Sequence, residues 1–204
     1  MKIKILTFIK IMIIILTIAL ITNCNRHNNI EIRKSDCEIA ITYDFNIDSI
    51  IAKQKQELAN ENINEIWSEF VQEKIDLLTK ARQDRNLLFP FSDIDSAVFI
   101  DYENHFPNTS LEMKKIKYTV ILCKEKIDAM IDLVNDPNNF CYGDLGTQYY
   151  DAEIVFYKSG KKKATIRFDK HPEQMQFEPY NPLANSGLLN EASCNKLYEI
   201  APWK

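Results

Sequence analysis

The stretch EIVFYKSGKKKATIRF, residues 153–168, decides the expected fold. Its two halves, Glu153–Tyr157 and Lys163–Phe168, are rich in β-branched and aromatic residues, which are enriched in strands. Ser159-Gly160 lies between them, and a short turn containing glycine between two such runs is typical of a β-hairpin. The sequence therefore predicts an antiparallel pair of strands here.

Other segments predict further strands around this hairpin. Asp95–Tyr102 and Lys115–Leu122 alternate apolar and polar residues, and Glu38–Phe45 and Met175–Phe177 are shorter candidates. Asn104–Ser110, between two of these strands, is predicted to be a loop. Together the strands predict an antiparallel sheet of about four to six strands.

Helical periodicity separates the strands. Apolar residues recur at spacings of three and four over Ile63–Ala81, and Ile47–Leu58 extends the pattern upstream. Asn60-Glu61-Asn62 leaves open whether this stretch is one long helix or two. Trp67 and Phe70 lie on the apolar stripe, where core packing is favoured over contact with a ligand.

Two shorter helices complete the expected layout. Lys124–Val134 has helical spacing, and Asn190–Ile200 is predicted to be a capped helix. The order of elements predicts the α+β class, with an antiparallel sheet packed against a long N-terminal helix and two shorter helices. A single globular α+β domain is expected at 38–204, after a signal peptide at 1–23 and a tether at 24–37.

The first two dozen residues have the pattern of an export signal. Three lysines precede the apolar run Ile11–Ile21, which is shorter than the roughly 20 residues of a membrane-spanning helix. An uncleaved anchor that starts at Ile5 is the alternative.

The segment Leu20-Ile21-Thr22-Asn23-Cys24 resembles the cleavage region of a bacterial lipoprotein signal. The resemblance implies that Cys24 becomes the N-terminus, carries acyl chains such as palmitate, and anchors the protein to a membrane at its periplasmic or surface face. Asn23 and Ile21 depart from the usual pattern, so secretion with cleavage elsewhere stays open. From Lys115 onward the layout is similar to that of small uncharacterised exported proteins of AT-rich bacteria, a similarity that implies no activity.

Composition disfavours several classes of function. The 204 residues include only 4 glycines, and no glycine-rich phosphate-binding motif occurs in the sequence. Without residues 1–23, 22 basic and 29 acidic residues remain, which disfavours nucleic acid as a partner because its binding relies on Lys and Arg. The sequence indicates neither a metal nor a cofactor.

Four cysteines follow Cys24. An even number in an exported chain permits one or two disulfides, and three pairings of the full set are possible. Buried thiols are the alternative. The four are Cys37, Cys123, Cys141 and Cys194.

Phe140–Asp151 is the densest candidate binding segment, because it contains glycines, acids and tyrosines without any periodic pattern. The side chains expected to bind are those of Asp144, Tyr149, Tyr150 and Asp151, together with the aromatic face of the neighbouring hairpin. The same acids and glycines are also ordinary turn residues.

Two functions of different class remain open. The first is a non-enzymatic binding or accessory module at the cell envelope, of the inhibitor or immunity type, with a protein partner. The alternative is a small envelope hydrolase that uses His105 or His171 with a nearby carboxylate. A histidine within about 3.2 Å of Cys141, Ser193 or a carboxylate inside a cleft would favour the hydrolase.

Overall fold

The computed structural model describes residues 31–35, 37, 45–60, 63–107, 114–141, 143, 148–169, 174–184 and 187–202. The chain divides into two compact units, Met1–Glu31 and Ile32–Lys204, and apart from Glu31 the elements below belong to the second. The predicted signal peptide, Cys24 and most of the candidate strand Glu38–Phe45 lie outside the described residues.

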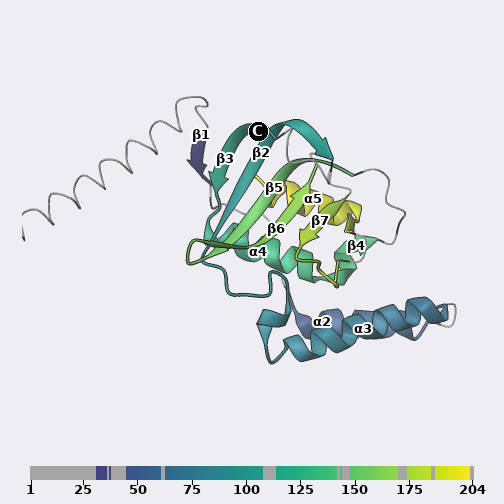
Figure 1. Cartoon of the computed structure of the whole chain (residues 1–204). Helices are drawn as coiled ribbons and strands as arrows, with labels where there is room; N and C mark the ends of the chain where they lie inside the picture. The colour runs from purple at the N-terminus through teal and green to yellow at the C-terminus, as the bar shows by residue number, and fades with distance from the viewer. Residues whose placement is uncertain are drawn as a thin grey trace, which may run out of the picture. The chain divides into compact units, whose positions relative to one another are not determined.

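A six-stranded sheet forms the centre of the second unit (Figure 1). Its strands follow the order β1-β3-β2-β5-β6-β7 across the sheet. Their bounds are β1 Glu31–Lys34, β2 Ser96–Pro107, β3 Ile116–Ile121, β5 Tyr149–Lys158, β6 Lys161–Phe168 and β7 Met175–Glu178. A separate two-stranded sheet pairs β4 (Phe140–Cys141) with β8 (Leu188–Leu189).

The predicted hairpin is confirmed as β5 and β6, which pair antiparallel on either side of Ser159 and Gly160. Both turn residues have positive φ, 51° and 72°, and glycine adopts such values without strain. The Ser159 amide donates to Asp95 Oδ2 at 2.6 Å, so the turn is tied to the segment that leads into β2.

The sheet is mixed rather than purely antiparallel, which corrects the prediction. Four pairings, β2 with β3, β2 with β5, β5 with β6 and β6 with β7, are antiparallel. The edge strand β1 instead runs in the same direction as its neighbour β3 (Figure 1). The sequence assigns β1 to the tether because an edge strand with an exposed Ile32 carries no buried apolar pattern.

β2 is longer than predicted and includes Asn104–Pro107, which the sequence assigns to a loop. Backbone pairing of Phe106 with Tyr150 extends the strand. The register with β5 shifts between Asp101 and Phe106, so the strand is irregular there and the apolar alternation stops.

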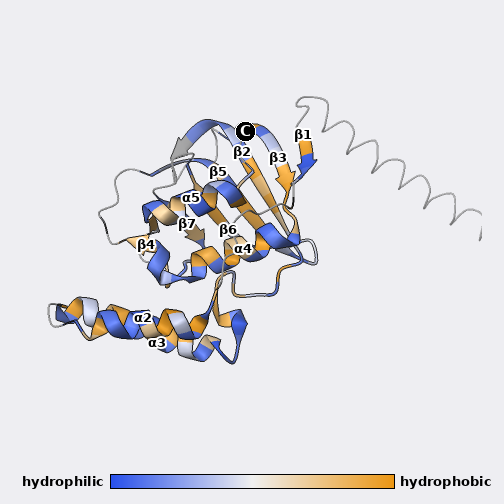
Figure 2. Cartoon of the chain, turned by 180° about the vertical axis from the view of Figure 1, so that it is seen from behind, coloured by the Kyte–Doolittle hydropathy of each residue, from blue (hydrophilic) through white to orange (hydrophobic). Residues whose placement is uncertain are grey.

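Two helices, α4 (Lys124–Asn135) and α5 (Glu191–Ile200), lie on the same face of the sheet and confirm the shorter helices of the prediction (Figure 2). Their apolar residues pack with inward-facing strand residues in one buried core. Large members of this core are Phe99, Ile154, Phe156, Ile166 and Phe168 from the strands, and Met130, Leu133, Leu197 and Ile200 from the helices.

The expected long N-terminal helix is in fact two helices, α2 (Ile47–Leu58) and α3 (Glu65–Ala81), which pack against each other. The side chains of Asn46 and Asn64 cap their N-termini, each by accepting from the backbone amide three residues later, at 3.0 and 2.8 Å. Because Asn64 has an extended backbone and begins a new helix, the apolar stripe is interrupted before it.

The α2–α3 pair has a hydrophobic core that is separate from the sheet core, which corrects the expectation that it packs on the sheet. Its buried members are Ile50, Ile51, Val71, Ile75, Leu78, Ala81, Leu88 and Leu183. Leu88 follows the short 3-10 helix η1 (Arg85–Leu87). A second 3-10 helix, η2 (Pro137–Asn139), contacts α2, because Gln54 Nε2 donates to Asn138 Oδ1 at 3.1 Å. Periodicity predicts a helix but does not identify the surface against which it packs.

Candidate functional site

The predicted binding segment is only partly at the surface. Tyr149 is 52% exposed, whereas Tyr150 and Asp151 are buried, and Asp144 lies outside the described residues. The Tyr150 hydroxyl donates to Gln148 Oε1. Tyr150 and Asp151 therefore do not present the binding surface that the sequence predicts, because β5 begins at Tyr149 and carries both residues into the sheet.

His105 does not form the hydrogen-bonded pair with a carboxylate that the hydrolase alternative expects. Its Nδ1 lies 3.8 Å from Asp151 Oδ2, beyond the length of a hydrogen bond, and its side chain is 67% exposed. Ser193 is buried, and its hydroxyl donates to Asn139 Oδ1 at 2.8 Å, which is a structural contact near the start of α5. His171 lies outside the described residues.

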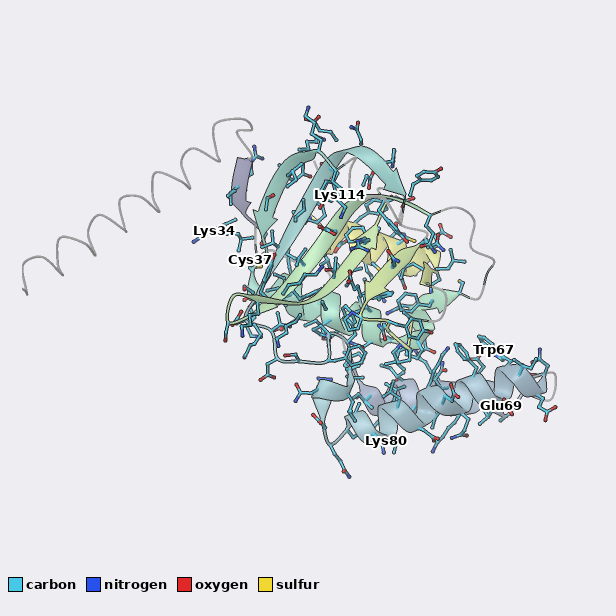
Figure 3. All side chains as sticks on the ribbon, in the orientation of Figure 1. Lys34, Cys37, Trp67, Glu69, Lys80 and Lys114 are labelled. Carbon is cyan, nitrogen blue, oxygen red and sulfur yellow. The ribbon has the colours of Figure 1, made fainter. Side chains whose placement is uncertain are left out.

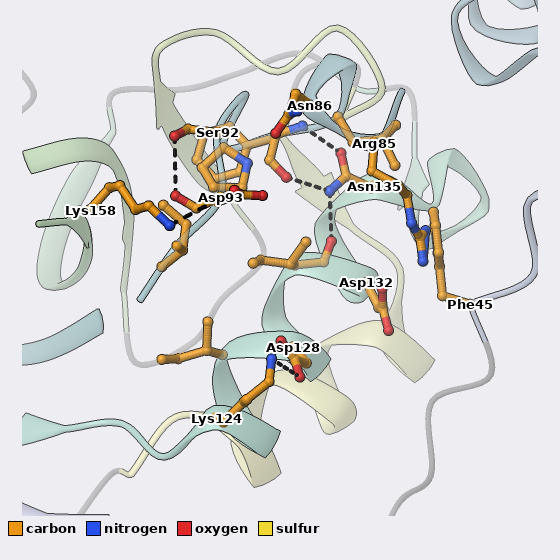
Figure 4. A pocket seen from close by; sticks show the side chains of 16 residues that line it. Phe45, Arg85, Asn86, Ser92, Asp93, Lys124, Asp128, Asp132, Asn135 and Lys158 are labelled. Carbon is orange, nitrogen blue, oxygen red and sulfur yellow. Dashed lines mark hydrogen bonds and ion pairs between the residues drawn. The ribbon is translucent and has the colours of Figure 1, made fainter. Parts of the chain in front are cut away.

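A pocket of about 630 Å³ lies beside one face of α4. Most residues between 85 and 94 line its other side, and Phe45 and Lys158 also line it (Figure 4). Lys124 Nζ lies 2.8 Å from Asp128, and Lys158 Nζ lies 3.8 Å from Asp93. Acidic and basic side chains line this α4 pocket in equal number, so its lining has a formal net charge of zero.

Asp132 and Asn135 contribute different properties to the α4 pocket. Burial raises the pKa of Asp132 to about 6, although nearby Arg85 opposes the rise. The Asn135 side chain holds the backbone of Phe89, accepting from its amide at 3.0 Å and donating to its carbonyl at 2.7 Å (Figure 4). This wall of the pocket is therefore fixed by the fold.

A second hollow, of about 660 Å³, lies on α3 near its N-terminus and has a different character. We call it the α3 groove; its lining residues are Asn64, Ile66, Trp67, Glu69, Phe70 and Glu73. Ile66 is 83% exposed, which is unusual for a large aliphatic side chain next to two aromatic ones. The Trp67 and Phe70 rings are half-buried, with centroids 5.6 Å apart (Figure 3 labels Trp67).

Contacts with Glu57 and Lys74 hold the two rings of the α3 groove in place. Trp67 Nε1 donates to Glu57 Oε1 at 2.8 Å, which satisfies the indole N–H. The buried Lys74 ammonium lies 5.3 Å from the Trp67 ring centroid and 4.5 Å from that of Phe70, a cation–π arrangement. Burial lowers the pKa of Lys74 to about 8, and Glu57 opposes this change. The rings are thus positioned before any partner arrives.

Sequence reasoning missed the exposed member of the α3 groove. Ile66 fits the three-and-four spacing, so the periodicity predicts that it is buried with the rest of the stripe. At about 100° per residue, however, Ile66 lies roughly 120° around the helix from the buried Leu78. The apolar arc of α3 is wider than α2 can cover, and the width of that arc is the signal that could have identified the groove.

The structure describes all four candidate disulfide cysteines as thiols. Cys141 is exposed on β4, and Cys194 packs partly against the sheet core from α5. Cys37 and Cys123 are brought together with Glu125, so that one ligand atom from each lies within 4.8 Å of the others.

The helices and the likeness to known proteins add no further indication of a site. Among the described residues, none of the helices has the length and apolar character needed to span a bilayer. The chain matches no known family of proteins, no curated protein and no solved structure.

Proposed function

We propose that this protein is a lipid-anchored binding module of the cell envelope, with no enzymatic activity, that captures a protein partner through the α3 groove. The lipoprotein-like segment ending at Cys24 supports the anchor and the location. The exposed Ile66 beside the fixed rings of Trp67 and Phe70 is the observation that carries the binding function. An accessory, inhibitor or immunity role fits such a module.

The chemistry of the α3 groove indicates the kind of partner. Its floor is apolar and aromatic, whereas Glu69 and Glu73 supply negative charge at its edge. Aromatic residues at the centre with charges at the rim are typical of protein interfaces, and the charges favour a partner of opposite sign. A basic amphipathic helix meets both requirements, because its apolar face fits the groove and its lysines face the acids.

The hydrolase alternative has less support. Its residue His105 is exposed to solvent, and its distance from Asp151 exceeds the hydrogen-bond length that general acid–base catalysis requires.

Binding at the α3 groove can be followed through Trp67 itself. In a Trp203→Phe background, Trp67 is the remaining tryptophan and reports on the groove by fluorescence. We expect a synthetic amphipathic helix of lysine and leucine to shift this signal, and Ile66→Ser to weaken its affinity by about tenfold or more. Stability should change by less than about 0.5 kcal/mol, because Ile66 is exposed.

Ile32→Ser is the matched control, since it removes another exposed isoleucine outside the groove. It should leave the affinity for the helical peptide unchanged. Equal affinities of the Ile66→Ser and Ile32→Ser proteins would contradict the α3 groove as the binding surface. Added salt should also weaken binding to the parent protein, because the acids at the rim are exposed to solvent.

The anchor is tested by labelling cells with an acyl-chain precursor. Label should enter the parent protein and be lost in Cys24→Ala, because the resemblance to lipoproteins places the acylated sulfur there. Cys141→Ala keeps Cys24 and should stay labelled. Recovery of the parent protein as an unlabelled soluble chain would contradict the anchor and leave export alone.

A further inference from the structure

Two cysteines that are far apart in the sequence lie side by side in the fold. The Sγ atoms of Cys37 and Cys123 and a carboxylate oxygen of Glu125 all lie within 4.8 Å of one another. Cys37 follows β1, and Cys123 is the residue immediately before α4. Cys37 is exposed on this edge of the protein, where a reagent can reach it (Figure 3).

Hydrogen bonds from Ser35 fix the two segments relative to each other. The Ser35 amide donates to the carbonyl of Ile121 at 2.9 Å, and the Cys123 amide donates to Ser35 Oγ at 2.8 Å. The two partners of Ser35 are therefore the last residue of β3 and the residue immediately before α4. The thiol of Cys37 donates to the carbonyl of Ser35 at 3.9 Å, and this contact keeps it near Cys123.

The thiols of Cys37 and Cys123 also influence each other's charge state. The pKa of Cys37 is raised to about 11, first by its hydrogen bond with the Cys123 thiol and then by partial desolvation and by the negative charges of Cys123 and Glu125. Because the raised pKa keeps the Cys37 thiol neutral, the two sulfur atoms lie close together without repulsion between thiolates.

We propose that Cys37 and Cys123 form a disulfide in the exported protein; this inference rests on the export proposed above. The two sulfur atoms lie within 4.8 Å of each other and must approach to about 2.0 Å, and Cys37 is exposed at this edge of the protein. The bond assigns a partner to Cys37, which the sequence leaves open. It also ties the segment after the tether covalently to the start of α4.

The oxidant is a second disulfide, either of a thiol oxidoreductase or of a small molecule such as oxidised glutathione. One thiolate of the pair attacks a sulfur of that disulfide and releases one of its thiolates. The other thiolate of the pair then attacks the mixed disulfide and releases the second. The protein loses two protons and two electrons, and the oxidant becomes two thiols.

Peptide mapping tests the pairing directly. The full chain, purified in detergent and reduced, is treated with oxidised glutathione, alkylated and digested without reductant. We expect one linked species that joins the peptides of Cys37 and Cys123. Cys37→Ser should abolish it, whereas Cys141→Ser should retain it. Complete alkylation of both cysteines, or linkage of either one to Cys141 or Cys194, would overturn the inference.

The same cluster could instead hold a soft cation, since thiolates and a carboxylate are zinc ligands. Oxidation is therefore repeated after incubation of the reduced chain with Zn²⁺. Two results together would overturn the disulfide in favour of a metal site. Zn²⁺ would protect Cys37 and Cys123 from alkylation until a chelator is added, and no linked peptide would form in the sample without Zn²⁺.

Trapping thiols in intact cells separates this inference from the proposed export. We expect Cys37 and Cys123 to resist an alkylating agent in cells until a reductant is added. A bond that forms in vitro while both thiols are alkylated in cells would overturn the export and leave the pairing standing. Wrong pairing in vitro would overturn the inference alone.

The bond should also raise thermal stability. Closing the long loop between Cys37 and Cys123 restricts the unfolded chain, so reduction should lower the midpoint of unfolding by about 5–15 °C. The Cys37→Ser protein should unfold at the same temperature with and without reductant. A reductant effect that persists in Cys37→Ser would show that another bond is responsible.

Discussion

Replacing Asn135 with alanine should lower the free energy of unfolding by about 3–5 kcal/mol. The Asn135 side chain is fully buried and makes hydrogen bonds with the amide of Phe89 at 3.0 Å and with its carbonyl at 2.7 Å. It also donates to the carbonyl of Ile131 at 2.8 Å. Alanine removes these partners, and a buried backbone group without a partner costs about 1–3 kcal/mol.

Urea unfolding of the full chain measures this loss, and Asn86→Ala is the matched control. Asn86 lines the same α4 pocket but is exposed, so its replacement should change stability by less than about 0.5 kcal/mol. A loss below about 1 kcal/mol for Asn135→Ala would show that water replaces the amide there. The α4 pocket would then be a hydrated cavity whose wall is not fixed by Asn135.

The parts of the fold that were predictable are those in which local sequence and tertiary burial agree. In β5 and β6, β-forming residues flank Ser159-Gly160, and the turn itself sets which strands pair. The two helices over the sheet likewise carry apolar residues at helical spacing. Such elements are marked by their own residues, whatever surrounds them.

The errors occur where backbone pairing or long-range packing decides. β1 joins an edge through main-chain hydrogen bonds, so its polar side chains do not mark it as a strand. Tyr150 is buried by strands that are distant in sequence, and no local pattern distinguishes it from the exposed Tyr149. The approach of Cys37 to Cys123 depends on the register of β1 with β3 in the same way.

The α3 groove shows a third kind of failure. The stripe on α3 predicts an apolar face correctly, yet α2 covers only part of that face. Whether a residue such as Ile66 lies in the core or at the surface depends on how much of the apolar face α2 covers. The sequence of α3 alone does not specify this coverage. The candidate site could therefore be inferred only after the two helices were placed against each other.

Replacing Gly187 with alanine should destabilise the protein by about 3–5 kcal/mol. Gly187 has a φ of 78°, and a Cβ added to it would lie 2.0 Å from the carbonyl oxygen of Met175. That contact is with backbone, so a change of side-chain rotamer cannot relieve it. The amide of Met175 also donates to the Gly187 carbonyl at 2.7 Å, which fixes the two segments at close range.

Gly160→Ala separates backbone strain from this close approach. Gly160 has a similar φ of 72°, but nothing lies within 4 Å of a Cβ built there. Its replacement should cost only the strain of a left-handed residue, about 1–2 kcal/mol. The difference between the two variants in urea unfolding then measures the contact between Met175 and Gly187. Equal losses would mean that the two segments can separate, and that β8 and the start of α5 are not held against β7 by this contact.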